Sequence, residues 1–374
     1  MKLSWTLING IVFFQALVFS LLLTPVSITL GKRFGLIDHP KIDRFHKQTK
    51  VRSGGIAIFL GFAIAALLDL VLVYFLYKND ALFQENVSRL LGNVKAVLPR
   101  LIGLMAGASF IFLVGLVDDR FTLRPRTKLL CQVLSAVPLL LVGIRIRLFL
   151  PAGFGILLTM FWIVLLTNSF NLLDNMDGLA SGTAIIVSLV FSFVSWQAGN
   201  RFMTVILILL AGSIMGFWYF NFIKSRLFMG DGGSHFIGYM IAALSIQATY
   251  YKTGAPTSLP VLTPLVILAV PLFDTISVMF IRFREGRPLM KGDTNHFSHR
   301  LVSLGMSPRQ AVVFIYLVTV CVALAAMPLG YLPLVPALVQ FSQVVFWFFL
   351  IFLIERAGKR KLDEEKNKLR GVNE

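Results

Sequence analysis

Charged residues are scarce in this chain, and acidic ones are scarcer than basic ones. Only 14% of the 374 residues are charged while 57% are hydrophobic, and 18 Asp and Glu stand against 35 Lys and Arg. The sequence also lacks a polar stretch of domain size, a low-complexity tract, a Pro-rich linker and a short repeat. A soluble globular protein is therefore excluded, and the composition is typical of a polytopic membrane protein.

Cysteine is nearly absent, which limits the covalent and metal chemistry open to the chain. Cys131 and Cys321 are the only two, and both lie within apolar runs. We expect packed thiols there, and neither a disulfide framework nor a cysteine-based metal site.

Long apolar runs are what the chain has instead. A helix needs about 20 mostly apolar residues to cross the hydrocarbon core of a bilayer. The first run lacks an A-x-A-like cleavage site and is followed by more, so we interpret it as a retained helix. The predicted fold is an all-α integral membrane protein, a bundle of about 11 transmembrane helices. The candidate spans are 7–30, 54–77, 101–117, 127–144, 155–173, 179–198, 202–221, 233–250, 258–281, 310–328 and 332–354.

The excess of basic residues reports topology. In a soluble chain a net charge of +17 would suggest binding to nucleic acid, which we do not expect here. If the loops alternate between the two sides, one side carries 26 of the 35 Lys and Arg. That side holds the loops after the odd-numbered spans up to the ninth, together with the C-terminal tail. The positive-inside rule makes it cytoplasmic and places the N-terminus outside. The basic tail is interpreted as a solvated helix or an anionic-lipid anchor.

The segment NSFNLLDNMDG, residues 168–178, joins two apolar runs on the predicted cytoplasmic side. Asn168, Asn171 and Asp174 can share one helical stripe, but Asp177 would lie opposite Asn168 unless the helix breaks within the last four residues of the segment. With that break, both acids can face one cavity. Capping of the flanking helices is the alternative role, but it does not explain four amide or acid groups at one membrane interface.

Two adjacent acids, Asp118 and Asp119, end the third span on the same side. The helix macrodipole is negative there, so the pair needs compensation by cations. Four basic residues follow immediately, and a metal or a metal–phosphate complex would also serve. The alternative is a solvated acidic turn.

The segment MGDGGS, residues 229–234, places Asp231 among three glycines at a predicted helix start. Close backbone approach and unpaired N–H groups suit a diphosphate or a metal–diphosphate. No G-K-[ST] follows, so it is not a P-loop. Taken alone, Asp231 or Ser234 could equally be a helix cap.

The loop after the ninth span contains His296, His299 and Arg300. These residues suit donors to phosphate oxygens better than zinc ligands, since zinc would need an i, i+4 histidine pair or further ligands. Asp274 lies within the ninth span, and an intramembrane acid is functional or specifically paired by default. Asp69 in the second span has the same status, and its partner is not evident from the sequence.

In order, and over residues 38–304, these motifs resemble the polyprenyl-phosphate N-acetylhexosamine-1-phosphate transferase family of integral membrane enzymes, of the glycosyltransferase 4 type. The family's paired aspartates match Asp118 and Asp119, its lysine with a glutamine four residues on matches Lys128 and Gln132, and its N-x-x-N-x-x-D-x-x-D-G pattern matches residues 168–178. Its asparagine ten residues before the G-D-x-G-S aspartate matches Asn221, and that aspartate matches Asp231. Its late P-x-x-D matches Pro271 and Asp274, and its histidine-rich loop matches His296, His299 and Arg300.

Two features set this chain within the family. The first cytoplasmic loop of the family reads like P-x-P-R-x-G-G, and Thr49 and Val51 replace both prolines here while Arg52 and the glycines remain. The late loop HFSHRL is similar to the branch that transfers N-acetylglucosamine-1-phosphate. The branch that transfers phospho-N-acetylmuramoyl-pentapeptide has consecutive histidines there and ten spans, and it remains the alternative.

The resemblance implies transfer of N-acetylglucosamine-1-phosphate from UDP-GlcNAc, a UDP-N-acetylhexosamine, to a polyprenyl (undecaprenyl or decaprenyl) phosphate, with UMP leaving, at a bacterial inner membrane. It implies Mg²⁺, or Mn²⁺ in its place, and is compatible with a homodimer. Residues 1–355 would be one catalytic domain with cytoplasmic loops, and residues 356–374 a basic tail. Those loops would be 31–53, 118–128, 168–178, 222–232 and 282–309. A transporter of nucleotide-sugars or lipid-linked sugars is the alternative from another class.

The same resemblance assigns roles to residues. Asp231 would be the principal metal ligand, with Asn171 second. Asp118 and Asp119 would be catalytic, orienting the lipid phosphate or acting as base, and Asp274 structural. The substrate-binding residues would be Arg52, Lys128, Asn168, Asp174, Asp177, Asn221, His296, His299 and Arg300.

Overall fold

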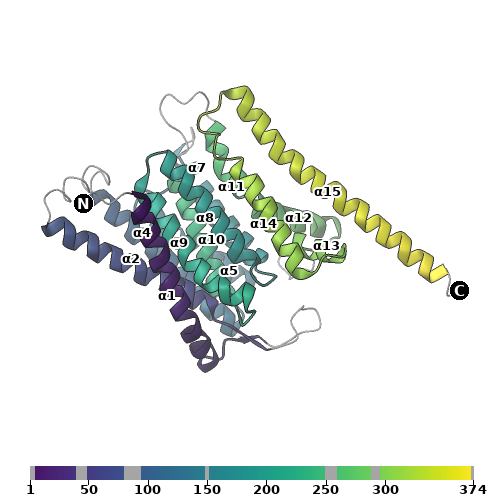
Figure 1. The fold of residues 1–374 in the computed structure, drawn as a ribbon, viewed down its shortest axis with the longest axis horizontal. Coiled ribbons are helices and arrows are strands. Elements are labelled where there is room, and N and C mark those ends of the chain that lie inside the picture. Colours follow the sequence, from purple (N-terminus) through teal and green to yellow (C-terminus); the bar gives the residue numbers. More distant parts are fainter. Residues whose placement is uncertain are drawn as a thin grey trace. The chain divides into compact units, whose positions relative to one another are not determined.

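The computed structural model describes residues 5–38, 49–79, 94–147, 151–248, 259–287 and 295–371. These fall into two compact units, Met1–Thr249 and Tyr250–Glu374. Almost all of the described chain is helical (Figure 1).

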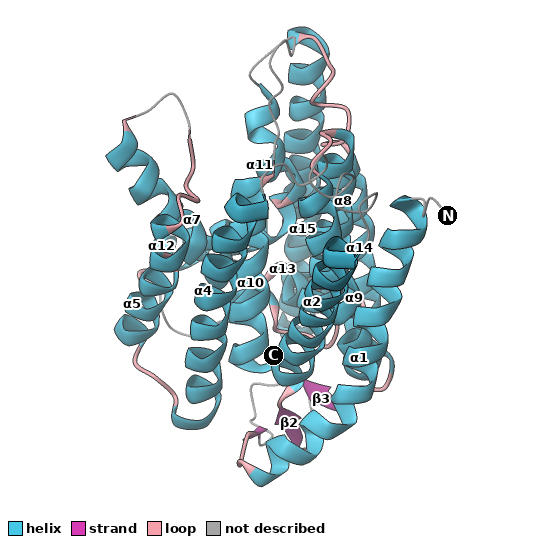
Figure 2. Ribbon diagram, turned by 90° about the vertical axis from the view of Figure 1, so that its left-hand side faces the viewer, coloured by secondary structure: helices cyan, strands magenta, loops and turns pink. Residues whose placement is uncertain are grey.

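The first unit is a helical bundle with a small sheet at one end (Figure 2). Strand β2 pairs antiparallel with β1 and parallel with β3. The pairing of β2 with β3 joins the segment after α1 to the segment before α10. Its elements are α1 (Trp5–Arg33), β1 (Ile37–Asp38), β2 (Lys50–Arg52), α2 (Gly54–Asn79), α4 (Val94–Phe121), α5 (Pro125–Ser135), α6 (Val137–Leu141), α7 (Ala152–Leu173), α8 (Leu179–Gln197), α9 (Arg201–Trp218), the π-helix η1 (Tyr219–Ile223), β3 (Leu227–Phe228) and α10 (Gly230–Gln247).

Helix α10 is the core of this unit, since every residue from Gly232 to Ser245 is buried. It packs against α4, α7 and α2. Glycines make the approach close: a Cβ on Gly115 of α4 would lie 2.5 Å from the Asp231 carbonyl oxygen, and one on Gly55 of α2 would lie 2.3 Å from the Gly233 nitrogen. The start of α10 is therefore fixed by backbone-to-backbone packing.

The helices of the first unit alternate in direction, as the sequence predicts. The ends of α1, α4, α7 and α9 lie beside the starts of α2, α8 and α10, because side chains and the sheet link them there. Four of the five predicted cytoplasmic loops thus share one end of the unit. The side of the membrane on which that end lies stays a prediction.

The all-α membrane class is supported, but the number of about 11 spans is not confirmed. Within the described residues, seven helices are long and apolar enough to cross a membrane, or up to eight if one bent pair counts as a span. The predicted span 127–144 is broken into α5 and α6, and Pro138 at the start of α6 is consistent with that break. The ninth predicted span is bent by 67° between Pro260–Ile267 and Ala269–Arg284.

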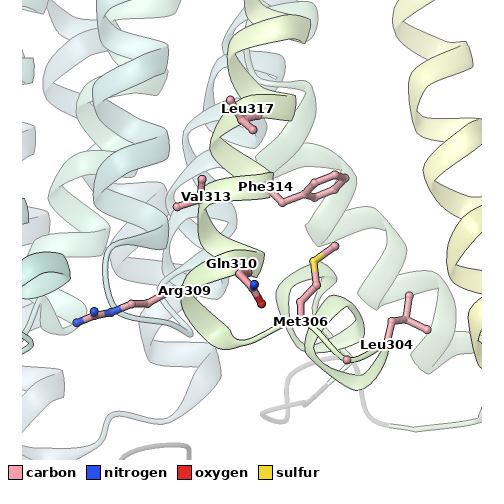
Figure 3. A pocket seen from close by; sticks show the side chains of 8 residues that line it. Leu304, Met306, Arg309, Gln310, Val313, Phe314 and Leu317 are labelled. Carbon is pink, nitrogen blue, oxygen red and sulfur yellow. The ribbon is translucent and has the colours of Figure 1, made fainter.

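The second unit is smaller and also helical. Its C-terminal helix is continuous through the predicted tail boundary at residue 356. An apolar groove runs along its helix α14, and none of the predicted site residues lines it (Figure 3). The elements of this unit are η2 (Leu259–Leu262), α11 (Thr263–Ile267), α12 (Ala269–Arg284), α13 (Phe297–Ser303), α14 (Pro308–Leu324) and α15 (Leu334–Gly371).

Candidate active site

The start of α10 is the centre of a polar cluster in the first unit. The Asp231 Oδ1 atom accepts a hydrogen bond from Asn171 Nδ2 at 2.9 Å, and its Oδ2 atom accepts one from Lys128 Nζ at 3.3 Å. Gly230 before it has φ 76°, and a Cβ there would lie 2.6 Å from an Asp119 oxygen. Glycine is therefore needed at this position for both conformation and space. Helices α5, α7 and α10 converge on one carboxylate.

Asp119 caps α10 from another helix. Its carboxylate accepts hydrogen bonds from the backbone N–H groups of Asp231 at 2.9 Å and Gly232 at 3.1 Å. The first N–H groups of a helix have no partner within it, and a carboxylate there is also favoured by the macrodipole. Asp119 thus holds the backbone that carries Asp231.

Asp118, the residue before Asp119, is almost wholly buried. It forms an ion pair with Lys128, and its Oδ1 atom accepts the Leu123 N–H at 2.7 Å. Lys128 therefore bridges Asp118 and Asp231 and is one of the compensating cations that the sequence predicts. Arg120, which follows the pair directly, donates instead to the Phe34 carbonyl.

The two asparagines of α7 have different surroundings. Asn171 also donates to Ser234 Oγ at 2.9 Å, so it ties α7 to two residues of α10. Asn168 exchanges hydrogen bonds with the buried Gln132 of α5, at 3.2 and 2.6 Å between the amide atoms. That pair joins α5 to α7 one helical turn before Asn171. Asn168 therefore holds together two of the helices that carry the cluster.

A second group surrounds Asp177. Helix α7 ends at Leu173 and α8 begins at Leu179, which confirms the predicted break. The N-cap of α8 is Gly178, so Asp177 is not its cap. Asp177 instead binds Lys50 Nζ at 2.7 Å and accepts a hydrogen bond from Ser225.

Asn221 links the segment after Asp177 to strand β3. Its Oδ1 atom accepts the Gly178 N–H at 2.6 Å, and its Nδ2 atom donates to the Leu227 carbonyl at 2.9 Å. It lies on the π-helix η1 and is 2% exposed. Arg52, the predicted binder on β2, pairs with Asp38 at 2.7 Å and is about a quarter exposed.

Two acids of the site differ in ionisation. Burial would raise the pKa of Asp231, but its hydrogen bond with Asp118 and the Lys128 charge outweigh burial and lower that pKa. Burial and the negative charges of Asp231 and Asp177 raise the pKa of Asp174 well above its ordinary value. The pKa values of these two neighbouring acids are therefore shifted in opposite directions.

The residues predicted in the late loop lie in the second unit. Asp274 is buried and accepts the Phe297 N–H at 2.6 Å, and it contacts His296 Nδ1 at 2.8 Å. Arg300 pairs with Glu355 at 3.0 Å. Asp274 is therefore specifically paired, as an intramembrane acid should be. The phosphate-binding roles of His296, His299 and Arg300 stay predictions.

Comparison with known proteins shows which family this sequence resembles. Residues 101–249, from α4 to the end of α10, match the family Glycosyl transferase family 4. A decaprenyl-phosphate N-acetylglucosaminephosphotransferase of Mycolicibacterium smegmatis is 33% identical over 77% of this chain and 74% of its own length. The chain belongs to glycosyl transferase family 4. The matched region contains Asp118, Asp119, Asn171 and Asp231.

Two other relatives of this glycosyl transferase are similar over nearly all of the chain. A probable undecaprenyl-phosphate N-acetylglucosaminyl 1-phosphate transferase of Bacillus subtilis is 28% identical over 96% of this chain and 94% of its own length. An undecaprenyl-phosphate alpha-N-acetylglucosaminyl 1-phosphate transferase of Escherichia coli K12 is 26% identical over 91% and 90%.

The donor atoms of the family 4 cluster fit a hard divalent cation. Mg²⁺ is commonly held by one or two carboxylates and keeps several waters. Asp231 offers a partly exposed, ionised carboxylate, and the Asn171 amide beside it presents an oxygen if it is turned over. No group of three or more His, Cys, Asp and Glu poised to hold a metal occurs in the described residues.

The sequence did not single out Lys50 or Ser225 of this glycosyl transferase. Lys50 Nζ also lies 4.7 Å from the centre of the Phe228 ring, so it links β2 to β3 as well as to Asp177. The available signal was its place in a basic loop on the same side as the acids. Asp69 has a partner too, since Gln15 Nε2 donates to it at 3.2 Å.

Proposed function

We propose that this protein transfers N-acetylglucosamine-1-phosphate from UDP-GlcNAc to a polyprenyl phosphate, releasing UMP and forming a lipid-linked diphosphate sugar. The supporting observation is the convergence of Asp118, Asp119, Asn171, Lys128 and Asp231 at one end of an apolar bundle. The relatives' names specify the sugar and the lipid phosphate. The nucleotide donor and the cation dependence are part of the proposal.

The reaction joins an oxygen of the lipid phosphate to the sugar-bearing phosphorus, and the bond from that phosphorus to the UMP oxygen breaks. A phosphate monoester is mostly doubly ionised near neutral pH because its second pKa is about 6. The attacking oxygen therefore needs alignment more than deprotonation. Catalysis of such a transfer is chiefly positioning and neutralisation of developing charge.

Each part of the cluster has a task in this proposal. Asp231, supported by Asn171, would hold Mg²⁺ or Mn²⁺, which when bound neutralises charge on the diphosphate. The Asp119 carboxylate holds the Asp231 backbone N–H and so fixes the position of Asp231. Lys128 would meet a phosphate oxygen, and Asp118 would orient the lipid phosphate or Lys128. Asp174, Asp177 and Arg52 would line the nucleotide and sugar, and Asn221 would support them by holding the Gly178 backbone.

The lipid acceptor explains why the site lies on a membrane bundle. Its phosphate is at headgroup level while its polyprenyl chain remains in the hydrocarbon. The acids lie at helix ends of the first unit, where apolar spans stop. We place this end at the cytoplasmic face of a bacterial inner membrane, where the nucleotide donor would be supplied.

A transfer assay tests the proposal. Purified protein with polyprenyl phosphate, Mg²⁺ and radiolabelled UDP-GlcNAc should give lipid-soluble label with one UMP per sugar. Label from UDP-MurNAc-pentapeptide alone would favour the muramoyl-pentapeptide alternative. Sugar flux across proteoliposomes without UMP would favour a transporter and contradict the proposal.

Gly115→Ala tests the packing that positions Asp231. The added Cβ would lie 2.5 Å from the Asp231 carbonyl oxygen, so the start of α10 must shift. We expect turnover to fall by about a hundredfold, the cost of a misplacement near 1 Å, while helix content by circular dichroism is kept because alanine favours helix. Gly10→Ala on α1, where a Cβ meets nothing within 4 Å, is the matched control. Normal turnover in Gly115→Ala would contradict this account of α10.

A further inference from the structure

Lys50 of strand β2 holds an acid that is distant from it in the chain. Its Nζ atom lies 2.7 Å from Asp177 Oδ2 and donates to Ser225 Oγ at 2.6 Å. Ser225 in turn donates to the same Asp177 oxygen. Three segments, β2, the chain before α8 and the turn before β3, are therefore joined at one carboxylate oxygen.

The exposed fractions distinguish the two partners of this ion pair. The Lys50 side chain is 11% exposed, and its Nζ atom also lies 4.7 Å from the centre of the Phe228 ring. The Asp177 side chain is 26% exposed. Its other oxygen, Oδ1, lies 3.5 Å from Asn221 Nδ2, at the limit of a hydrogen bond. Asp177 is thus held through Oδ2 by a more buried cation, while its carboxylate remains accessible to a ligand.

Ser225 has a backbone conformation that serine rarely adopts. Its φ is 49°, in the left-handed region. Residues in such conformations persist where the surrounding structure holds them, and they cluster at ligand-binding and active sites. In this conformation the Ser225 hydroxyl contacts both Lys50 and Asp177. The turn before β3 is therefore shaped around the ion pair.

The sheet directs Lys50 towards this turn. Strand β2 is the middle strand and lies beside β3 (Figure 2). Side chains alternate along a strand, so Val51 is buried while Lys50 and Arg52 share the other face. Val51 stands where the family motif has a proline, which a middle strand does not accommodate. The departure from the family pattern thus coincides with the strand that carries Lys50.

The same strand reaches the start of α10. Strand β2 pairs with β3, which leads into Gly230, and a Cβ on Gly230 would lie 3.0 Å from the Arg52 carbonyl oxygen. The negative charges of Asp231 and Asp177 both raise the pKa of Asp174. Asp177 and Asp231 are therefore both close to Asp174, and the Lys50 group adjoins the cluster at the start of α10.

We propose that Lys50 is a positioning residue for the UDP-sugar donor: with Ser225 it holds the Asp177 carboxylate in the orientation in which that carboxylate accepts a hydrogen bond from a hydroxyl or N–H group of the donor. This inference rests on the proposed function, in which Asp177 lines the nucleotide and sugar. A carboxylate that is already oriented loses less freedom when the donor binds. Loss of Lys50 should therefore weaken donor binding and leave the transfer step almost unchanged.

The test is a double-mutant cycle of Lys50→Met and Asp177→Asn, measured on folded, monodisperse enzyme. Lys50→Met should raise the KM for UDP-GlcNAc by about tenfold to a hundredfold, the range for loss of a hydrogen bond to a charged group. Its kcat should change by no more than about threefold, because uniform binding is what is removed. In the Asp177→Asn background Lys50→Met should have little further effect, since Lys50 acts through Asp177.

Lys224→Met is the matched control. Lys224 precedes Ser225 in the same turn, but its Nζ atom lies over the Tyr219 ring, 4.8 Å from the ring centre. This variant removes the same charge from the same region and should leave the KM for UDP-GlcNAc unchanged.

Ser225→Gly tests the inference even if Lys50→Met folds poorly. Glycine adopts a positive φ without strain, so the Tm should not fall. The hydroxyl is lost, and the KM for UDP-GlcNAc should rise by about threefold to tenfold, as for loss of one hydrogen bond. An unchanged KM in both variants, a fall in kcat with an unchanged KM, or effects of Lys50→Met and Asp177→Asn that multiply would each overturn the inference.

Donor binding measured without turnover separates this inference from the proposed function. Calorimetric titration with UDP-GlcNAc should give a Kd at least about ten times higher for Lys50→Met than for the wild type or Lys224→Met. That difference in Kd, with a wild type that releases no UMP, would overturn the proposed function and leave the role of Lys50 in donor binding standing. Release of UMP by the wild type, with equal Kd values in all three proteins, would overturn this inference alone.

Discussion

Asp231→Asn should abolish cation-dependent UMP release while the protein inserts and folds normally. The substitution keeps the shape of the side chain but removes the ionised oxygen that would hold the cation, and Asn171 and Lys128 lose their shared acceptor charge. We expect turnover to fall by about a thousandfold or more, as when an electrostatic stabiliser of a transition state is removed. The measurement is UMP release against Mg²⁺ concentration.

The fold of this variant should survive because the Asp231 side chain is 27% exposed and its backbone is held by Asp119. Binding of Mn²⁺, followed by electron paramagnetic resonance, should weaken in parallel with turnover. Glu285→Gln removes an exposed carboxylate in the second unit and is the control. Near-normal UMP release by Asp231→Asn would remove the metal assignment.

Asp118→Asn should impair turnover far more than donor binding. Asp118 is paired with Lys128, which contacts the Oδ2 atom of Asp231, whereas Asn171 contacts the Oδ1 atom. We therefore assign Asp118 to the acceptor phosphate. Loss of its charge should lower kcat by about a hundredfold to ten-thousandfold, the range for a group acting on proton position or phosphate alignment. The KM for UDP-GlcNAc should change by no more than about threefold, because uniform binding is not removed.

Initial rates at varied donor and acceptor concentrations check this separation. Asp69→Asn serves as the control, since Asp69 lies within the α2 span and pairs with Gln15. Equal losses in kcat and in donor affinity would place Asp118 beside the nucleotide instead of the acceptor.

Local sequence pattern predicted the helices and the alternation of their ends. Apolar runs of span length became α1, α2, α4, α7, α8 and α9, and the polar segment 168–178 broke the chain between α7 and α8. Because alternate loops return to one end, Asp119 and Asp231 could be expected together although 112 residues separate them. The glycines of MGDGGS likewise follow from the close approach of Asp119 and α2.

A helix break and several contacts between distant residues depend on tertiary packing and were not predicted from the sequence. The predicted span 127–144 is broken into α5 and α6, and the apolar run by itself did not show that bend. The pairing of Lys50 with Asp177 joins residues 127 positions apart, and Lys50 lies on β2, which pairs with β3. Arg300 is bound by Glu355, a residue that the sequence did not single out.

Cysteine labelling from the two sides of the membrane tests the convergence of the loops most directly. In a background in which Cys131 and Cys321 are replaced by serine, single cysteines at Thr122, Asn175, Lys224 and Gly305 should react with an impermeant maleimide in inside-out vesicles only. A cysteine at Gly199, between α8 and α9 at the opposite end of the first unit, should react in right-side-out vesicles only. Labelling of any of the first four from the outer side would contradict a single cytoplasmic site.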